Sequence, residues 1–242
     1  MTLFLTSSPF IDGADRAILS NANGFIDRIR EALPPYPRML YICSSPGNRA
    51  DTCGYGADTF TAFAQAGIPC SSYAVLDAFN ADEAEALIAA SDFIVLCGGH
   101  VPTQNAFFQE IGLRELLEGY EGVIMGISAG SMNSPDVVYV QPEAPGESDP
   151  DFERFAPGLG LTDVNICPHY QKVKDVILDD LRLFEDITYA DSMGHTFFAL
   201  PDGSYFYQDE EQLLLCGEAY RIHNGILELL TLDGEVLDMS KL

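Results

Sequence analysis

Residues 122–130 have the sequence GVIMGISAG, which contains the strongest structural signal in this chain. Its first six residues are a continuous apolar run, which predicts a strand buried on both faces of a parallel sheet. The last five fit the pattern G-x-S-x-G, in which a strand turns sharply into a helix and exposes a serine hydroxyl. The stretch therefore predicts an α/β protein with Ser128 at the carboxyl edge of its sheet.

Similar apolar runs alternate with amphipathic segments along the first two thirds of the chain. Such strands separated by helices predict a parallel sheet with both faces covered. The predicted strands are Leu3–Thr6, Met39–Cys43, Ser72–Leu76, Phe93–Cys97, Gly122–Ile127 and Val164–Cys167. The predicted helices are Gly24–Leu33, Ala57–Ala66, Ala81–Ala90, Gly112–Leu117 and Val173–Phe184.

The pattern changes after about residue 135. Gln141–Gly160 is rich in proline, glycine and acidic residues and predicts a long loop. Short alternating runs follow from Thr196 onward, separated by turn sequences such as Pro201-Asp202-Gly203-Ser204. These predict antiparallel hairpins at the sheet edge. No linker interrupts the chain, so we expect a single domain over residues 1–242.

The net charge of the chain limits the kinds of molecule that it can bind. The 242 residues carry 12 Lys and Arg against 37 Asp and Glu, a formal net charge of −25. Such a field repels phosphate backbones and anionic membrane surfaces, so neither nucleic acid nor a membrane is expected as a partner. With no signal peptide and no membrane-spanning run in the sequence, we expect a cytoplasmic protein. Its six scattered cysteines form no C-x-x-C motif and predict reduced thiols.

A serine nucleophile needs a base, and the chain has four histidines. His169 follows the apolar run that ends at Cys167, so it shares the strand-end edge with Ser128. His100 follows Gly98-Gly99 at another strand end and is the second candidate. Strand-end placement favours His169 as the base.

The acid that would orient the histidine is harder to choose among 37 carboxylates. Glu143 lies between Ser128 and His169 in the chain, but from the residues alone a solvated loop acid is the better explanation. Other candidates for the acid are Asp136, Glu147 and Asp191.

Two glycines complete the set of candidate site residues. Gly98-Gly99 lets the backbone approach a ligand and direct an N–H toward it. The N–H of Ala129, directly after the serine, is the other candidate donor to an oxyanion. The sequence has no nucleotide-binding motif and no metal-ligand spacing, so we expect no cofactor and no metal.

Together, the motifs GISAGSMN, LCGG and GLGL…NICPHY resemble those of the peptidase E family, which includes aspartyl dipeptidase and is related to cyanophycinase. The resemblance runs from about Leu40 to Tyr207. It implies a three-layer α/β sandwich with a mostly parallel central sheet, of the class I glutamine-amidotransferase-like type, and a serine peptidase without cofactors.

The same resemblance assigns roles by position. Ser128 matches the nucleophile and His169 the base, while Gly98 and Gly99 match the oxyanion loop, together with Ala129. The family's acid lies about fifteen residues after the serine, which selects Glu143.

Two features depart from the family pattern. His100 replaces a third glycine or an asparagine, and the stretch Glu143–Gly158 is longer than in the dipeptidase. Both lie near the expected substrate pocket. An N-terminal Asp on the substrate would need a cation, for which Lys172, Lys174 and Arg154 are candidates.

The expected function is therefore hydrolysis of small peptides through a Ser–His–Glu triad and an acyl-enzyme, with dipeptides that begin with Asp among the candidate substrates. The expected partner is a small peptide, and the sequence leaves a homodimer open. One alternative is an α/β-hydrolase esterase, although the separation of 41 positions from Ser128 to His169 leaves little room for that topology. The other is a non-catalytic binding module on the same fold.

Overall fold

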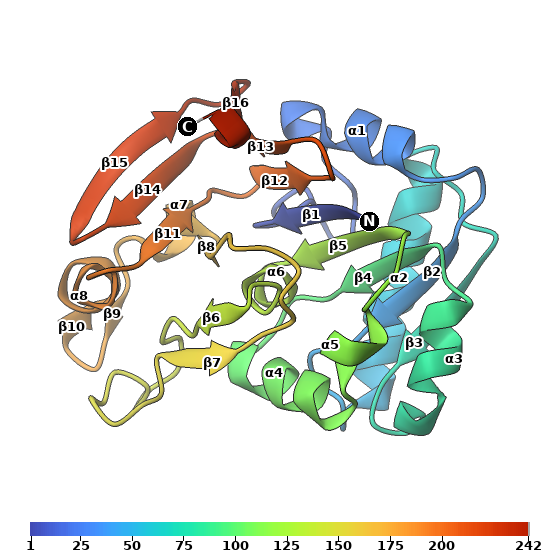
Figure 1. The fold of residues 1–242 in the computed structure, drawn as a ribbon, viewed down its shortest axis with the longest axis horizontal. Coiled ribbons are helices and arrows are strands. Elements are labelled where there is room, and N and C mark those ends of the chain that lie inside the picture. Colours follow the sequence, from blue (N-terminus) through green and yellow to red (C-terminus); the bar gives the residue numbers. More distant parts are fainter. Residues whose placement is uncertain (242) are drawn as a thin grey trace.

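A computed structural model describes residues 1–241. Its main feature is an eight-stranded sheet with the strand order β16-β13-β12-β1-β5-β4-β2-β3 (Figure 1). These strands are β1 (Thr2–Thr6), β2 (Arg38–Ile42), β3 (Ser72–Leu76), β4 (Phe93–Leu96), β5 (Val123–Ile127), β12 (Tyr205–Gln208), β13 (Leu213–Cys216) and β16 (Val236–Asp238). The pairings from β1 to β3 are parallel, whereas those from β1 to β16 are antiparallel.

Helices cover both faces of this sheet, which gives three layers (Figure 1). On β5, Ile124 joins one hydrophobic core, while Val123 and Met125 join the other. Every residue of β5 is buried, as a parallel strand covered on both sides requires. The helices are α1 (Phe25–Ala32), α2 (Arg49–Gln65), α3 (Ala84–Ala89), α4 (Val101–Glu110), α5 (Leu113–Leu116), α6 (Ala129–Met132), α7 (Tyr170–Val173) and α8 (Tyr189–Asp191).

A second sheet lies beside the main one and has the order β15-β14-β11-β8 (Figure 1). Its strands are β8 (Ile166–Cys167), β11 (Thr196–Ala199), β14 (Ala219–His223) and β15 (Ile226–Thr231). β8 and β11 run parallel, with Cys167 opposite Ala199. Two small hairpins complete the fold, formed by β6 (Val137–Tyr139) with β7 (Phe155–Pro157) and by β9 (Ile177–Leu178) with β10 (Leu181–Arg182).

These observations confirm the predicted α/β class, with its mostly parallel central sheet and antiparallel strands toward the C-terminus. The helix predicted over Val173–Phe184 is wrong. Asp179 and Asp180 adopt left-handed backbone conformations, with φ of 49° and 66°, and turn the chain between β9 and β10. Asp191, one of the candidate acids, lies in α8, which directly follows the π-helical segment η3 (Leu183–Thr188). No helix within residues 1–241 is long and apolar enough to cross a bilayer.

Helix α6 packs very closely on the strands at the end of β5. A Cβ added at Gly130 would lie 2.1 Å from the carbonyl oxygen of Leu96 in β4, and one added at Gly126 would lie 2.6 Å from the backbone nitrogen of Ser131. Neither neighbour is a flexible side chain. Glycine is therefore required at both positions for the turn from β5 into α6 to form.

Replacing Gly130 should be costly for this reason. We expect Gly130→Ala to lower the free energy of unfolding by about 2–3 kcal/mol, as overpacking in a closed core does. Gly54→Ala, in helix α2, is the matched control because nothing lies within 4 Å of a Cβ there. The control should stabilise the protein by about 0.5–1 kcal/mol. Urea unfolding of both variants measures the difference, and equal effects would contradict the close approach.

Candidate active site

Ser128 occupies the turn between β5 and α6 (Ala129–Met132). Its backbone has φ 50° and ψ −110°, a conformation that a residue with a side chain rarely adopts. The turn is held by hydrogen bonds from the backbone N–H of Ser128 to the carbonyl of Thr6 (3.0 Å) and from the Ser131 hydroxyl to the same oxygen (2.9 Å). The strained turn thus raises the Ser128 hydroxyl above the strand ends, as the sequence pattern predicts.

His169 lies beside this serine, as predicted. Its Nε2 is 2.9 Å from the Ser128 hydroxyl, within hydrogen-bond distance. The residue follows β8 and has a left-handed backbone with φ 58°. Its backbone N–H donates to the Ser7 hydroxyl at 2.7 Å, which ties the end of β8 to the end of β1. The histidine therefore reaches Ser128 from the second sheet.

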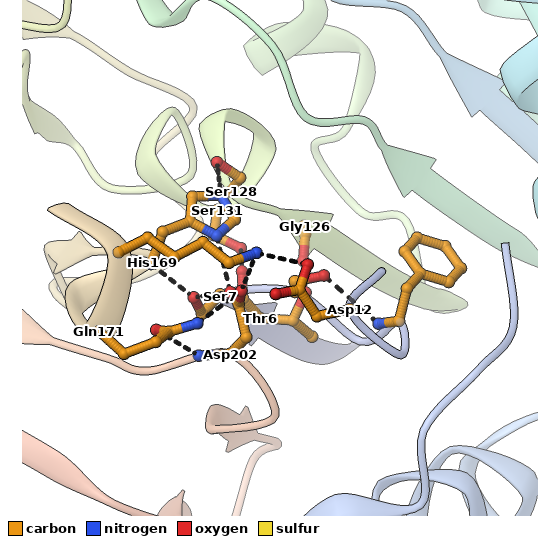
Figure 2. A network of polar contacts seen from close by, with 12 residues as sticks. Thr6, Ser7, Asp12, Gly126, Ser128, Ser131, His169, Gln171 and Asp202 are labelled. Carbon is orange, nitrogen blue, oxygen red and sulfur yellow. Dashed lines mark hydrogen bonds and ion pairs between the residues drawn. The ribbon is translucent and has the colours of Figure 1, made fainter. Parts of the chain in front are cut away.

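Asp202 contacts the other ring nitrogen of His169, Nδ1. Its Oδ1 lies 2.6 Å from His169 Nδ1, and Ser7 donates its hydroxyl to the same oxygen at 2.9 Å. Oδ2 accepts from Gln171 Nε2 at 2.7 Å and from Lys172 Nζ at 2.9 Å. Figure 2 shows Ser128, His169 and Asp202 in one connected network of polar contacts. Three residues far apart in the chain thus form a continuous row of hydrogen bonds.

The predicted contact between Glu143 and His169 is wrong. Glu143 Oε1 is 3.8 Å from His100 Nε2, and its side chain is 48% exposed. Asp202 occupies the position that Glu143 was expected to fill, because the Pro201–Ser204 turn places it next to the end of β8.

The other candidate acids also have different partners. Asp136 pairs with Arg114 at 2.6 Å, and Glu147 pairs with His100 at 2.9 Å. Asp191 pairs with Arg154 at 3.3 Å and accepts a hydrogen bond from the Tyr139 hydroxyl at 2.9 Å. His100 is engaged by Glu147 and by the Thr103 hydroxyl at 2.7 Å. It therefore holds the loop that carries Glu147 instead of contacting Ser128.

The surroundings of Asp202 favour its ionised form. Burial acts to raise the pKa of this carboxyl, since only 10% of its side chain is exposed. The hydrogen bond and charge of His169, with the hydrogen bonds from Lys172 and Ser7, outweigh burial and hold the pKa well below its usual range. Lys172 also pairs with Asp12, and both acids raise the pKa of the Lys172 ammonium. An ionised Asp202 beside His169 fixes which ring nitrogen of the histidine carries the proton.

The glycine loop lies beside the serine as expected from the sequence. A Cβ on Gly98 would be 3.5 Å from the Ser128 Cβ, and Gly99 lines the same cavity as Ser128. Gly99 has φ 155°, and a Cβ there would meet the Ser44 hydroxyl at 2.2 Å. Ser44 donates to the Gly98 carbonyl at 2.7 Å, which fixes the loop. A residue with a side chain at position 99 would push this loop away from Ser128.

Asp202 is not among the residues predicted from the sequence, although the sequence contains a signal for it. Cys167-Pro168-His169 and Leu200-Pro201-Asp202 share one pattern, an apolar strand followed by a proline and a polar residue. β8 and β11 are parallel neighbours, so the residues that follow them emerge side by side. The turn sequence at 201–204 is also typical of a hairpin turn, so the local pattern alone does not reveal this pairing.

A serine at the end of a parallel strand, hydrogen-bonded to a histidine that in turn contacts an aspartate, is the arrangement that defines the general class of serine hydrolases. The comparison with protein families is more specific. The model of peptidase family S51 matches residues 5–215. The chain belongs to this family and is a serine-type peptidase.

Solved structures include a related fold. The crystal structure described as "a Putative Peptidase E Protein from Listeria monocytogenes EGD-e" matches with a TM-score of 0.58 and 15% sequence identity. The match covers 95% of this chain and 98% of that one. At this identity the likeness concerns the fold. No curated protein sequence matches the chain.

The pKa of Asp202 gives a pH-dependent contribution to stability. Since the folded pKa is lowered, the contribution is present above the unfolded value of about 3.9 and is lost as the pH falls below it. We expect Asp202→Asn to lower the free energy of unfolding by about 2–3 kcal/mol at pH 7 and by clearly less at pH 3.

The control is Asp233→Asn, at an exposed aspartate in a turn. It should leave the free energy of unfolding nearly unchanged at both pH values. Urea titrations of the three proteins measure these differences. A gap between wild type and Asp202→Asn that is the same at pH 7 and pH 3 would contradict a lowered pKa.

Proposed function

We propose that the chain hydrolyses small peptides with Ser128 as nucleophile, His169 as general base and acid, and Asp202 as the carboxylate that orients His169. The observation that carries this proposal is the pair of contacts on one imidazole, 2.9 Å from Nε2 to the Ser128 hydroxyl and 2.6 Å from Nδ1 to Asp202. Both distances lie within the range that such a relay needs.

The first half of the reaction forms an acyl-enzyme. The Ser128 oxygen attacks the peptide carbonyl carbon while His169 Nε2 takes the hydroxyl proton. The carbonyl electron pair moves to oxygen and then returns as the C–N bond breaks. His169 delivers its proton to the leaving amine, so the acyl group stays on Ser128 as an ester. Asp202 stabilises the imidazolium that exists between these two proton transfers.

Water completes the cycle. His169 removes a proton from water, the hydroxide attacks the ester carbon, and the proton returns to the Ser128 oxygen as the acid product leaves. The N–H groups of Gly99 and Ala129 are our proposed donors to the oxyanion in both halves. Ala129 is the first residue of α6, where backbone N–H groups lack partners within the helix, and Gly99 lines the cavity with Ser128.

Membership of family S51 favours a peptidase over an α/β-hydrolase esterase. The hydrogen-bonded serine and histidine favour an enzyme over a non-catalytic binding module. We also propose that it works in the cytoplasm. All six cysteines are free and five of them are buried, as is typical of proteins from a reducing compartment.

Removing the nucleophile tests the function itself. We expect Ser128→Ala to fold as wild type and to lose on the order of 10³–10⁶ in peptide turnover. Labelling by a fluorophosphonate probe should be lost as well. Ser134→Ala is the control, since its buried hydroxyl only donates to the Gly130 carbonyl at 2.8 Å. Turnover by Ser128→Ala close to that of wild type would refute the proposal.

The identity of the acid is tested separately. Asp202→Asn should lower kcat by about 10³–10⁴, because the imidazole would adopt the wrong tautomer. Glu143→Gln and Asp191→Asn, which remove carboxylates at other places, should each keep kcat within about tenfold of wild type. Steady-state kinetics on one peptide compare the three. A severe loss for Glu143→Gln with a mild one for Asp202→Asn would reverse the assignment.

A further inference from the structure

A cavity of about 170 Å³ lies directly against the reacting serine. Ser128, His169 and Gly99 line one part of it. The rest is mainly apolar, and its aliphatic and thioether side chains are Val101, Met132, Val173, Val176, Leu178 and Leu183. Four of these six are at most 8% exposed, so they are fixed by packing in the core. The cavity is therefore a preformed apolar site next to the scissile bond.

The size of this cavity fits one amino-acid side chain. Apolar protein cavities of about 150 Å³ accept a benzene ring. At about 170 Å³, this one has room for a leucine or phenylalanine side chain. Because the walls offer few polar partners, a charged side chain placed there would lose its hydration without compensation.

The only carboxylate among the described residues that line the cavity is Glu143. Its loop is held in place by Glu147, which accepts hydrogen bonds from the backbone N–H groups of Glu143 and Ala144 at 2.8 and 2.9 Å. Burial, opposed by His100, raises the pKa of Glu143, so a cation brought to this carboxylate would be favourable. In a peptide, the amino nitrogen of the first residue is two bonds from its carbonyl carbon. An N-terminal ammonium is thus a cation that comes close to Ser128 whenever the first peptide bond does.

We propose that the enzyme selects peptides with a free amino terminus whose first residue has an apolar side chain of leucine or phenylalanine size. The side chain fills the apolar cavity and the ammonium group pairs with Glu143. This inference rests on the proposed peptidase function and names its substrate class.

The described residues of this cavity offer no cation for the side chain of an N-terminal Asp, the substrate residue that the family resemblance implies. Of the described residues, no lysine or arginine lines the cavity. Two of the three cations considered from the sequence have partners, Lys172 with Asp12 and Asp202, and Arg154 with Asp191. The third, Lys174, does not line this cavity. A substrate carboxylate would also be repelled by Glu143.

The larger cavity nearby gives no better site for an acidic side chain. Its volume is about 470 Å³ and Arg16 lines it, but so do Asp12, Asp58 and Asp202. Ser128 is not among the described residues that line it. A carboxylate bound there would meet three acidic groups and would lie outside the cavity that holds the nucleophile.

The test compares kcat/KM for leucyl-alanine, phenylalanyl-alanine, glycyl-alanine, aspartyl-alanine and N-acetyl-leucyl-alanine. Leucyl-alanine should exceed glycyl-alanine by about 10–100-fold, the range expected for burying its side chain. Aspartyl-alanine should be the poorest of the four unblocked peptides. Preference for aspartyl-alanine over leucyl-alanine would overturn the inference and leave the peptidase function intact.

Two variants test the two halves of the site. Val176→Arg adds a cation where the native side chain is 38% exposed, so folding should be kept. It should raise the ratio of aspartyl- to leucyl-alanine kcat/KM by about tenfold or more. Glu143→Gln should lower the preference for the free over the acetylated peptide by about tenfold, as loss of a charged hydrogen bond does. The control Glu153→Gln, at an exposed position of the same loop, should change neither ratio.

The failures are distinguishable. An unchanged preference for the free amino group in Glu143→Gln would overturn the role of Glu143. If none of the peptides is cleaved, the proposed function fails and this inference fails with it. Thermal unfolding of each variant, expected within a few degrees of wild type, shows that the ratios are measured on folded protein.

Discussion

The close approach of helix α6 to strands β4 and β5 is the constraint on which the site depends. Gly130 lies against the Leu96 carbonyl and Gly126 against the backbone of Ser131, so the chain has to reverse within a few residues. Such a short turn forces Ser128 into a positive φ, and this backbone conformation costs about 1–3 kcal/mol of strain. The surrounding hydrogen bonds to Thr6 keep the turn in place. The same packing that closes the core therefore exposes the hydroxyl of Ser128, the proposed nucleophile.

Ser7 connects this turn with the second sheet. Its buried hydroxyl accepts from the backbone N–H of His169 and donates to Asp202, so one small side chain fixes both partners of the relay. It directly follows β1, the strand that pairs with β5 on one side and with β12 on the other. The end of β1 thus sets the distance between the serine on the main sheet and the histidine on the second one.

Much of this arrangement could be predicted from local sequence. The apolar runs give the parallel strands, and the G-x-S-x-G turn gives Ser128, because both signals lie within a few consecutive residues. His169 could be found since it is one of four histidines and follows an apolar run. Asp202 is different: its role depends on β8 pairing with β11, a contact between residues more than thirty positions apart. Position in the chain alone could therefore not identify Asp202 among the 37 acidic residues.

The segment after α7 was mispredicted for a related reason. Its apolar spacing suits a helix, but Asp179 and Asp180 turn the chain, and the segment contributes Leu178 and Leu183 to the wall of a cavity. The segment that departs from its predicted helix is thus one that lines the cavity beside Ser128.

The order of the three residues along the chain has a consequence during synthesis. Ser128 leaves the ribosome first, His169 follows 41 residues later, and Asp202 comes last. Asp202 lies between β11, which pairs with β8, and β12, which pairs with β1 at the other end of the chain. A chain that ends before Asp202 lacks both the carboxylate that contacts His169 and the strand that pairs with β1. During synthesis, the proposed relay of Ser128, His169 and Asp202 is therefore completed only after the chain has been made past Asp202.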